Sequence, residues 1–464
     1  MHSENRHATD GRDERDHAAI PAGTGWNHDA PRPSGWVAFW PEPSCPDAEQ
    51  LESALAHWLE ETPEIRRAEN PDERGEVAWA FAASVPGIDE EVVFWAERAA
   101  RGAFGDETEL HAALAACPWV IRMQSILGRD DPVADHFVLT ALLAGSVPES
   151  PAILDASSDA IFDRHEIDSW FLHPQAKPLE RLLWSVKGTV VGAVERRIDI
   201  RTKGLSRCHR PELEIAGVPE PHLDAAVTLL HAVASLLLEG PMPAPGAAYE
   251  IGHGLSVRLA RWEIPAESVG DEPEIRARIC EPLNGSDDRG EGHASVGSAG
   301  AGTADESADP AGRRWSWPRR AIELAESGRA VLFLTGRTSD ALREHARRSF
   351  PDFATAWAAL RRCDDAALRE EATRAFRILA PVDPAAKEEI PEHAWFRVDG
   401  FEGSMVRASL LDAPLQRADL KVGTVMLIAP ELVRGWRADL SGRSFGPDDA
   451  PALLREVDRL RGVA

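Results

Sequence analysis

Between residues 35 and 269, helical and strand periods of apolar residues alternate, which predicts an α+β region. Runs rich in aromatic and β-branched residues indicate strands, and residues after Asp47, a favourable N-cap, show helical spacing. Strands are predicted at about 35–40, 77–81, 119–123, 182–186, 197–200 and 247–264, and helices at about 48–59, 89–100, 106–116 and 132–144. Two successive α/β subdomains, split near residue 155, fit this order.

The strongest helical pattern begins near Pro221. Its apolar residues recur at i, i+3 and i+4 as far as Leu237, and Gly240 with Pro241 ends it. This apolar run is shorter than the roughly 20 residues of a membrane span. The polar N-terminus also lacks the apolar stretch of a secretory signal. We therefore expect a cytoplasmic protein with no membrane contact.

After residue 313 the pattern is first helical and then strand-like. Helical faces are predicted at 339–346, 353–360 and 364–379, alternation of period two at 395–428, and a last helix at 451–460. The short alternating runs are separated by turn residues, which is typical of antiparallel strands. They predict a small curled sheet with packed helices.

Two stretches have few large apolar residues, and they set the predicted domain boundaries. Residues 1–34 read as a disordered tail, and residues 270–313, rich in Gly, Ser, Ala and Asp, read as a flexible linker. The prediction is thus an α+β region at 35–269 and a second folded part at 314–464.

Charge and cysteine usage narrow the function classes. The 464 residues carry a formal net charge of −26, which disfavours non-specific contact with nucleic acid or anionic membranes. The five cysteines are scattered singly, without a C-x-x-C pair, so a local zinc knuckle or a thioredoxin-type motif is excluded. Reduced thiols in a reducing compartment fit best. We predict no metal and no cofactor.

The C-terminal part carries four short segments of recognisable type. They are Glu-His-Ala-Trp-Phe-Arg-Val at 392–398, Leu-Leu-Asp-Ala-Pro at 410–414, Asp-Leu-Lys-Val-Gly at 419–423, and Trp436. This set resembles the YegJ-type bacterial domain of unknown function. In that family an aspartate precedes the closing tryptophan, whereas this chain has Gly435. The matching positions indicate a functional surface made of His393, Trp395, Pro414 and Trp436.

Residues of about 179–262 resemble a second uncharacterised bacterial family that often precedes this domain. The resemblance is carried by Gly-Leu-Ser-Arg-Cys at 204–208 and Arg-Pro-Glu-Leu-Glu at 210–214. Relatives have a His-Thr-His-Gly-Leu segment, whereas Arg201 and Lys203 replace both histidines here. A metal or acid–base role of those histidines is therefore lost in this chain. Neither family implies a known reaction.

Some residues invite a catalytic or metal-binding interpretation. Cys208 beside His209 has the composition of a nucleophile and base, but neighbours on a strand point to opposite faces. His165, Glu166 and His173 are metal-ligand types without the i, i+4 spacing of a helical zinc motif. Residues 335–338 (Thr-Gly-Arg-Thr) suggest a phosphate loop, yet the upstream glycine and the lysine are absent.

A basic and aromatic island lies at 313–320. Arg314, Trp315 and Trp317 belong to it, and arginine and tryptophan are enriched at binding hot spots and base-stacking sites. The competing interpretation is a helix entry with Pro318 at its first position.

These patterns favour a non-catalytic binding protein whose partner is another protein. The first alternative is a hydrolase with a Cys/His site in the 160–260 region, built around Cys208 and His209. The second is a nucleic-acid-associated protein that uses the island at 313–320.

Overall fold

The protein is an α+β protein, as its hydrophobic pattern predicts. The computed structural model describes residues 26, 32–59, 62–68, 76–100, 108–191, 196–252, 255–264, 274–282, 315–326, 333, 335–382, 392–414, 417 and 419–462. The chain divides into two compact units. The first holds residues 1–136, 153–161 and 181–334, and the second holds residues 137–152, 162–180 and 335–464.

The first sheet has the strand order β2-β3-β4-β5-β1-β6-β7. Its strands are β1 (Pro33–Trp40), β2 (Ile65–Arg67), β3 (Val77–Ala83), β4 (Val92–Arg98), β5 (Trp119–Ile126), β6 (Ala152–Asp155) and β7 (Ala160–Asp163). The helices along this stretch are α1 (Ala48–Trp58), α2 (Glu109–Ala115), α3 (Pro132–Ser146) and α4 (Arg164–Ile167). Asp47 caps α1 as expected, since its side chain accepts from the backbone N–H of Glu49.

The helix predicted at 89–100 is wrong, because β4 occupies this stretch. Val92, Phe94 and Ala96 are buried, whereas the residues between them face outward, which is the period of a strand. Neighbouring alanines, glutamates and arginines favour helices on propensity, but cross-strand pairing with β3 and β5 overrides it.

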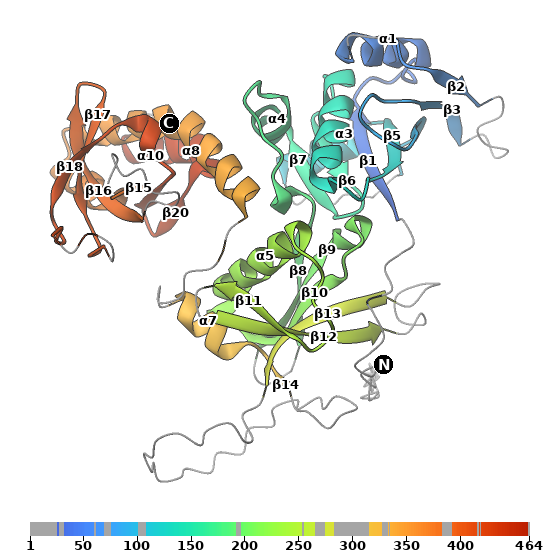
Figure 1. Ribbon diagram of the computed structural model, residues 1–464. Coiled ribbons are helices and arrows are strands. Elements are labelled where there is room, and N and C mark those ends of the chain that lie inside the picture. The colour runs from blue at the N-terminus through green and yellow to red at the C-terminus, as the bar shows by residue number, and fades with distance from the viewer. Residues whose placement is uncertain are drawn as a thin grey trace, which may run out of the picture. The chain divides into compact units, whose positions relative to one another are not determined.

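The second sheet has the order β11-β12-β13-β10-β9-β8, and β14 pairs with β13. Its strands are β8 (Ser185–Val191), β9 (Arg197–Lys203), β10 (Glu212–Pro219), β11 (Ala248–Gly252), β12 (Leu255–Ile264), β13 (Glu274–Pro282) and β14 (Trp315–Ser316). Helix α5 (Leu223–Glu239) lies along one face of this sheet (Figure 1), and α7 (Arg319–Glu326) follows β14.

The segment Glu220–Glu239 is long and apolar enough to cross a membrane, judged by length and composition alone. In the first unit, Leu229, Leu230, Val233 and Leu237 of this segment are fully buried. Its apolar character is therefore used for packing within the protein.

Three predicted boundaries shift. The second folded part is predicted to begin at residue 314, but β14 and α7 belong to the first unit, and the second unit resumes at Thr335. Strand β13 lies inside the sheet, so the linker predicted at 270–313 begins too early; residues 283–314 lie outside the described part. The split predicted near residue 155 falls within the first sheet, between β6 and β7, and the second sheet begins only at Ser185. Most of the tail predicted at 1–34 also lies outside the described residues.

The third sheet has the order β18-β17-β16-β15-β19-β20, and all its strand pairs are antiparallel. Its strands are β15 (Phe376–Pro381), β16 (His393–Glu402), β17 (Met405–Leu410), β18 (Val425–Ile428), β19 (Gly435–Leu440) and β20 (Arg443–Phe445), with helices α8 (Gly336–Arg361), α9 (Ala366–Ala375) and α10 (Ala450–Leu460). The faces predicted at 339–346 and 353–360 belong to one helix, α8, which tolerates Pro351. The helix predicted at 364–379 is wrong in its last part, because α9 ends at Ala375 and Phe376–Pro381 pair with two strands as β15. Short helical turns are η1 (Asp168–Leu172), η2 (Glu180–Leu182), η3 (Leu205–Cys208), η4 (Glu220–His222), η5 (Pro430–Leu432) and η6 (Pro447–Asp449).

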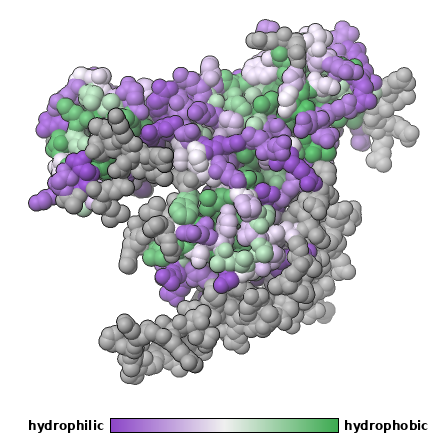
Figure 2. Space-filling view, in the orientation of Figure 1, coloured by the Kyte–Doolittle hydropathy of each residue, from purple (hydrophilic) through white to green (hydrophobic). Residues whose placement is uncertain are grey.

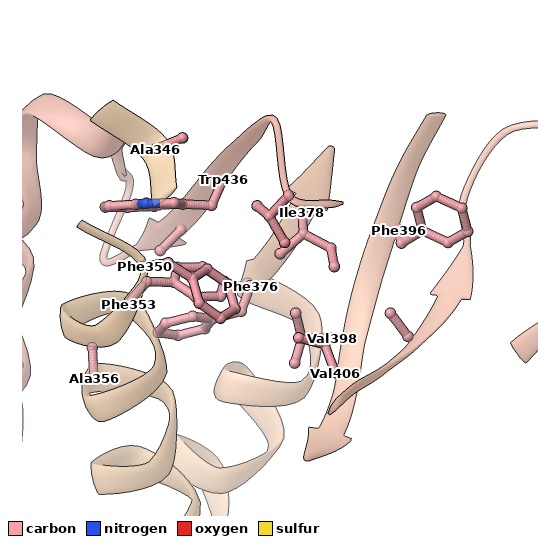
Figure 3. Close-up of a cluster of buried hydrophobic side chains, with 14 of the residues drawn as sticks. Ala346, Phe350, Phe353, Ala356, Phe376, Ile378, Phe396, Val398, Val406 and Trp436 are labelled. Carbon is pink, nitrogen blue, oxygen red and sulfur yellow. The ribbon is translucent and has the colours of Figure 1, made fainter. Parts of the chain in front are cut away.

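Aromatic side chains fill the core between this sheet and its helices (Figure 3). Phe353 of α8 lies 5.1 Å, between ring centroids, from both Phe376 of β15 and Trp436 of β19. The indole N–H of Trp436 donates to the hydroxyl of Ser349 at 3.0 Å, so its one polar atom is satisfied. This packing fixes which face of the sheet is turned toward the helices.

Candidate binding surface on the C-terminal sheet

The third sheet has one face packed against helices and one face turned away from them. Side chains alternate along its strands, so the neighbours of Phe376, Phe396 and Trp436 project to the opposite side. We call this side the open face; it carries Arg377, Leu379, His393, Trp395, Arg397, Arg407, Ser409, Val425, Leu427, Arg437 and Asp439.

Three arginines form a row across the open face. Arg377 on the central strand β15 is paired directly with Arg397 on β16 and with Arg437 on β19. We call these residues the arginine row. Their side chains are 40–51% exposed, so the guanidinium groups reach solvent. Cations are thus lined up on a chain whose net charge is −26.

Two aspartates contact the arginine row. Asp439 lies 2.7 Å from Nε of Arg437 and 3.5 Å from a terminal nitrogen of Arg377. Asp399 accepts from Nε of Arg397 at 3.2 Å and also from the hydroxyl of Ser409. The two carboxylates hold the guanidinium groups in place and leave the row with more positive than negative charge.

A pocket with a volume of about 490 Å³ opens over the arginine row. It is lined by Arg374, Arg377, Trp395, Arg397, Leu411, Asp412 and Arg437. Four guanidinium groups therefore stand against one carboxylate in the lining, next to an indole ring. Arginine pairs with carboxylates and phosphates in a planar, bidentate geometry, and tryptophan supplies a broad apolar contact.

The open face becomes apolar toward its edge at β18. Val425 and Leu427 are each about half exposed there, and Val422 in the preceding turn is 62% exposed. Figure 2 shows hydrophobic residues reaching the surface beside hydrophilic ones at the edge where Figure 1 places β17 and β18. The sheet thus offers a charged pocket and an apolar strip on one side.

The four residues named from the first resemblance do not share one environment. His393 and Trp395 lie on the open face of β16, and Trp395 lines the pocket. Pro414 is half-buried in the loop that follows β17. Trp436 is 2% exposed within the core, so it supports the sheet from behind and forms no part of a surface.

Sequence reasoning missed the arginine row, although a signal was present. Phe-Arg-Ile at 376–378, Phe-Arg-Val at 396–398 and Trp-Arg-Ala at 436–438 place an arginine between two core residues on three strands. Each triplet predicts an outward arginine. The strand register that aligns the three is visible only in the structure.

The segments behind the second resemblance build a buried charge cluster in the first unit. Arg207 donates to both oxygens of Asp155, at 2.8 and 2.5 Å, and to the carbonyl of Leu183 at 2.5 Å. His136 lies 3.2 Å from the same carboxylate. Burial alone would raise the pKa of Asp155, but the Arg207 guanidinium and the His136 contact hold it well below its usual range.

Glu212, which belongs to the segment 210–214, orders the turn that carries Arg207. It accepts from the backbone N–H groups of Gly204 and Ser206 and from the hydroxyl of Thr202. Gly204 has φ of 122°, and a Cβ there would lie 2.5 Å from the carbonyl of Leu183, so only glycine fits. The two segments therefore act as structural supports.

The catalytic pair considered at Cys208 and His209 lacks a reactive thiol. Cys208 is 4% exposed, and burial raises its pKa to about 12, so the thiolate needed for attack is not populated at neutral pH. His209 follows in a left-handed conformation with φ of 56°. Of the two positions where the resemblance expects histidine, Arg201 lies opposite Glu214 on β10, and Lys203 contacts Asp159 at 2.5 Å.

The other sequence candidates have structural roles where they are described. Glu166 forms a capping box with Asp163 at the start of α4. In the second unit, Glu180 accepts from the hydroxyls of Thr335 and Thr338, so a buried carboxylate already occupies the N-terminus of α8. Within the described ranges, no group of three or more His, Cys, Asp or Glu side chains is arranged to hold a metal.

The island at 313–320 is partly described. Arg314 lies outside the described residues, and Trp315 forms part of β14. The ring of Trp317 lies 5.7 Å from that of His222 and is half-buried. Pro318 is buried and precedes α7, as the helix-entry interpretation expects.

Comparison with known proteins adds no relative. No family model matches the chain, and neither the curated proteins nor the solved structures contain a significant match. The two resemblances stay predictions.

Proposed function

We propose that this protein is a non-catalytic binding protein that docks an acidic segment of a partner protein on the open face of its C-terminal sheet. The observation that carries the proposal is a pocket lined by four arginines and Trp395 in a protein that is otherwise strongly acidic. The rest of the surface is acidic and repels acidic partners. An acidic ligand therefore binds at this pocket only through its contacts with the arginines and Trp395.

The chemistry of the surface supports a protein partner. Arginine and tryptophan are enriched among the residues that dominate binding energy at protein interfaces. The apolar strip at Val425 and Leu427 adjoins the charged pocket across β17, since Val425 pairs with Ser409 and Ser409 with Arg397. An acidic segment with apolar side chains would bury the strip while its carboxylates pair with arginines.

The two alternatives gain less support. A hydrolase at Cys208 would require a thiolate that burial disfavours. The described part of the 313–320 island is used for packing at Trp317 and for an ion pair between Arg319 and Glu323 at 2.6 Å.

The test is affinity purification of the full chain from the organism that encodes it, with wild type, Trp395→Ala and Trp58→Ala in parallel. Trp58 is a matched control, because it is an exposed tryptophan on α1 of the first unit and no part of the C-terminal sheet. We expect a stoichiometric protein partner with wild type and Trp58→Ala, and its loss with Trp395→Ala. Equal retention by all three would contradict the proposal.

A further inference from the structure

The arginine row is an unusual choice for a sheet surface. Directly paired residues on antiparallel strands have Cα atoms about 4.5–5.5 Å apart, and like charges at such positions destabilise the sheet. Here Arg377 has an arginine directly opposite on both sides. A sheet selected only for stability would place an acid or an apolar residue at one of these three positions.

The acids nearby do not fully neutralise the row. Asp439 is shared between Arg377 and Arg437, and Asp399 divides its oxygens between Arg397 and Ser409. Arg397 and Arg437 donate to these aspartates through their Nε atoms. Each aspartate lies two residues further along the strand than the arginine whose Nε it contacts, and neither aspartate lines the pocket.

A fourth arginine completes the pocket from the end of α9. Arg374 lies 3.5 Å from Glu370, and both side chains are about 70% exposed, so this ion pair is weak and easily exchanged. Trp395 and Leu411 provide an apolar wall. The result is a recess for a compact group with several negative oxygens and an attached carbon chain.

We propose that this pocket binds the phosphate of a phosphorylated side chain on the partner protein. The inference rests on the proposed function for the existence of a protein partner. A phosphomonoester carries a charge of about −1.5 to −2 at neutral pH and three strong acceptor oxygens. Three convergent arginines match three oxygens, whereas a single carboxylate offers two oxygens and one charge, like the aspartates already present.

The surroundings favour one phosphate over a run of them. Asp412 lies at the pocket and is exposed, and the chain as a whole carries −26, so an extended polyanion such as nucleic acid meets repulsion outside the recess. A single phosphate on a peptide avoids this repulsion and leaves apolar side chains for the strip at Val425 and Leu427.

The experiment measures binding of fluorescent degenerate peptide pools to the full chain by anisotropy. Three pools share one design and differ only at the central residue, which is phosphoserine, serine or glutamate. We expect the phosphoserine pool to bind at least about tenfold more tightly than either of the others, the size of one charge-assisted hydrogen bond or more. A single-stranded oligonucleotide serves as a competitor.

Two variants locate the site. Arg377→Gln removes the central member of the row and is expected to weaken phosphoserine binding about tenfold or more. Arg362→Gln is the matched control, because Arg362 is an exposed arginine at the C-terminal end of α8, outside the pocket and no part of the open face. It should change affinity less than about twofold. Melting temperatures no lower than that of the wild type show that both variants retain folding.

Several results would overturn the inference. Equal binding of the phosphoserine and glutamate pools, equal losses in both variants, or full displacement by the oligonucleotide would each exclude a phosphate pocket of this kind. If no pool binds while co-purification still depends on Trp395, the phosphate inference fails and the proposed function stands. If co-purification is also independent of Trp395, both fail.

Discussion

Arginine side chains occupy two contrasting environments in this molecule. In the first unit, Arg207 is 1% exposed and meets a fully buried aspartate with paired hydrogen bonds. On the C-terminal sheet, the arginine row is 40–51% exposed, and its members face one another with too few acids between them. Both groups are held by aspartates, so residue type alone does not separate them.

The difference lies in what each arginine would lose by removal. A buried charge without its partner is strongly unfavourable, so we expect Arg207 to contribute strongly to stability. An exposed arginine beside like charges contributes little to stability or lowers it, so the row requires another explanation. The number of acidic contacts around each arginine therefore distinguishes Arg207, which has a structural role, from the arginine row, for which we propose a role in binding.

The largest expected effect is on the buried cluster. Arg207→Met leaves Asp155 charged, buried and without its guanidinium, which should lower the free energy of unfolding by about 3–5 kcal/mol. Urea unfolding followed by tryptophan fluorescence measures the loss. The double variant Arg207→Met/Asp155→Leu should recover much of it, because no lone charge then stays buried. A loss below about 1 kcal/mol in the single variant would show that Asp155 is not held as described.

The second-largest expected effect is a loss of stability of the first unit in mild acid. His231 accepts from the indole N–H of Trp184 at 3.0 Å, and burial, with Arg181 nearby, lowers its pKa to about 4. The unfolded chain takes up this proton near pH 6.5 and the folded chain only near pH 4. Stability from neutral His231 is thus complete above pH 6.5 and falls by about 2–3 kcal/mol toward pH 4.

Thermal unfolding at a series of pH values measures this loss. His231→Gln keeps an acceptor for Trp184 and removes the titration, so its stability should fall less between pH 6.5 and 4 than that of the wild type. Parallel curves for the two proteins would mean that His231 is not the group responsible.

Removal of an arginine from the row should change the free energy of unfolding in the opposite direction to removal of Arg207. Arg377→Gln relieves repulsion from Arg397 and Arg437, so the free energy of unfolding should stay the same or rise by about 0.2–1 kcal/mol. Differential unfolding of wild type and variant in the same urea series provides the measurement. A clear loss of stability would place Arg377 with Arg207 among structural arginines and remove the contrast.

The smallest expected change in stability, with a large change in binding, concerns Gly435. It lies opposite Leu379 on the open face, and an added Cβ would meet Leu379 side-chain atoms at an ordinary 3.7 Å. Gly435→Asp should alter stability by less than about 0.5 kcal/mol and yet weaken an anionic ligand of the neighbouring Arg437. Gly435→Asn, equal in size and uncharged, should bind normally in the same titration; equal weakening would point to shape instead of charge.

Local patterns predicted much of the fold. The cap at Asp47, the helix ended by Gly240 and the alternating strands after Trp395 follow from short-range rules, and each is present. Strand β4 and strand β13 were missed because their assignment depends on pairing with distant strands. Propensity and composition do not contain that information.

The site was only partly predictable. The resemblance pointed to Trp395 and His393, which lie on the open face, but also to Trp436, which lies in the core. The arginines were accessible through their repeated position between core residues. Their convergence needed the register of three strands, and the burial of Cys208 needed the packing of a whole unit.

The most direct test of the central claim is chemical footprinting of arginines in the complex with the co-purified partner. Phenylglyoxal modifies accessible guanidinium groups, and mass spectrometry locates each product. We predict that the partner protects Arg377, Arg397 and Arg437 while exposed Arg66 on β2 reacts as it does in the free protein. Full labelling of the arginine row in a stable complex would show that the partner binds elsewhere, and it would contradict the account.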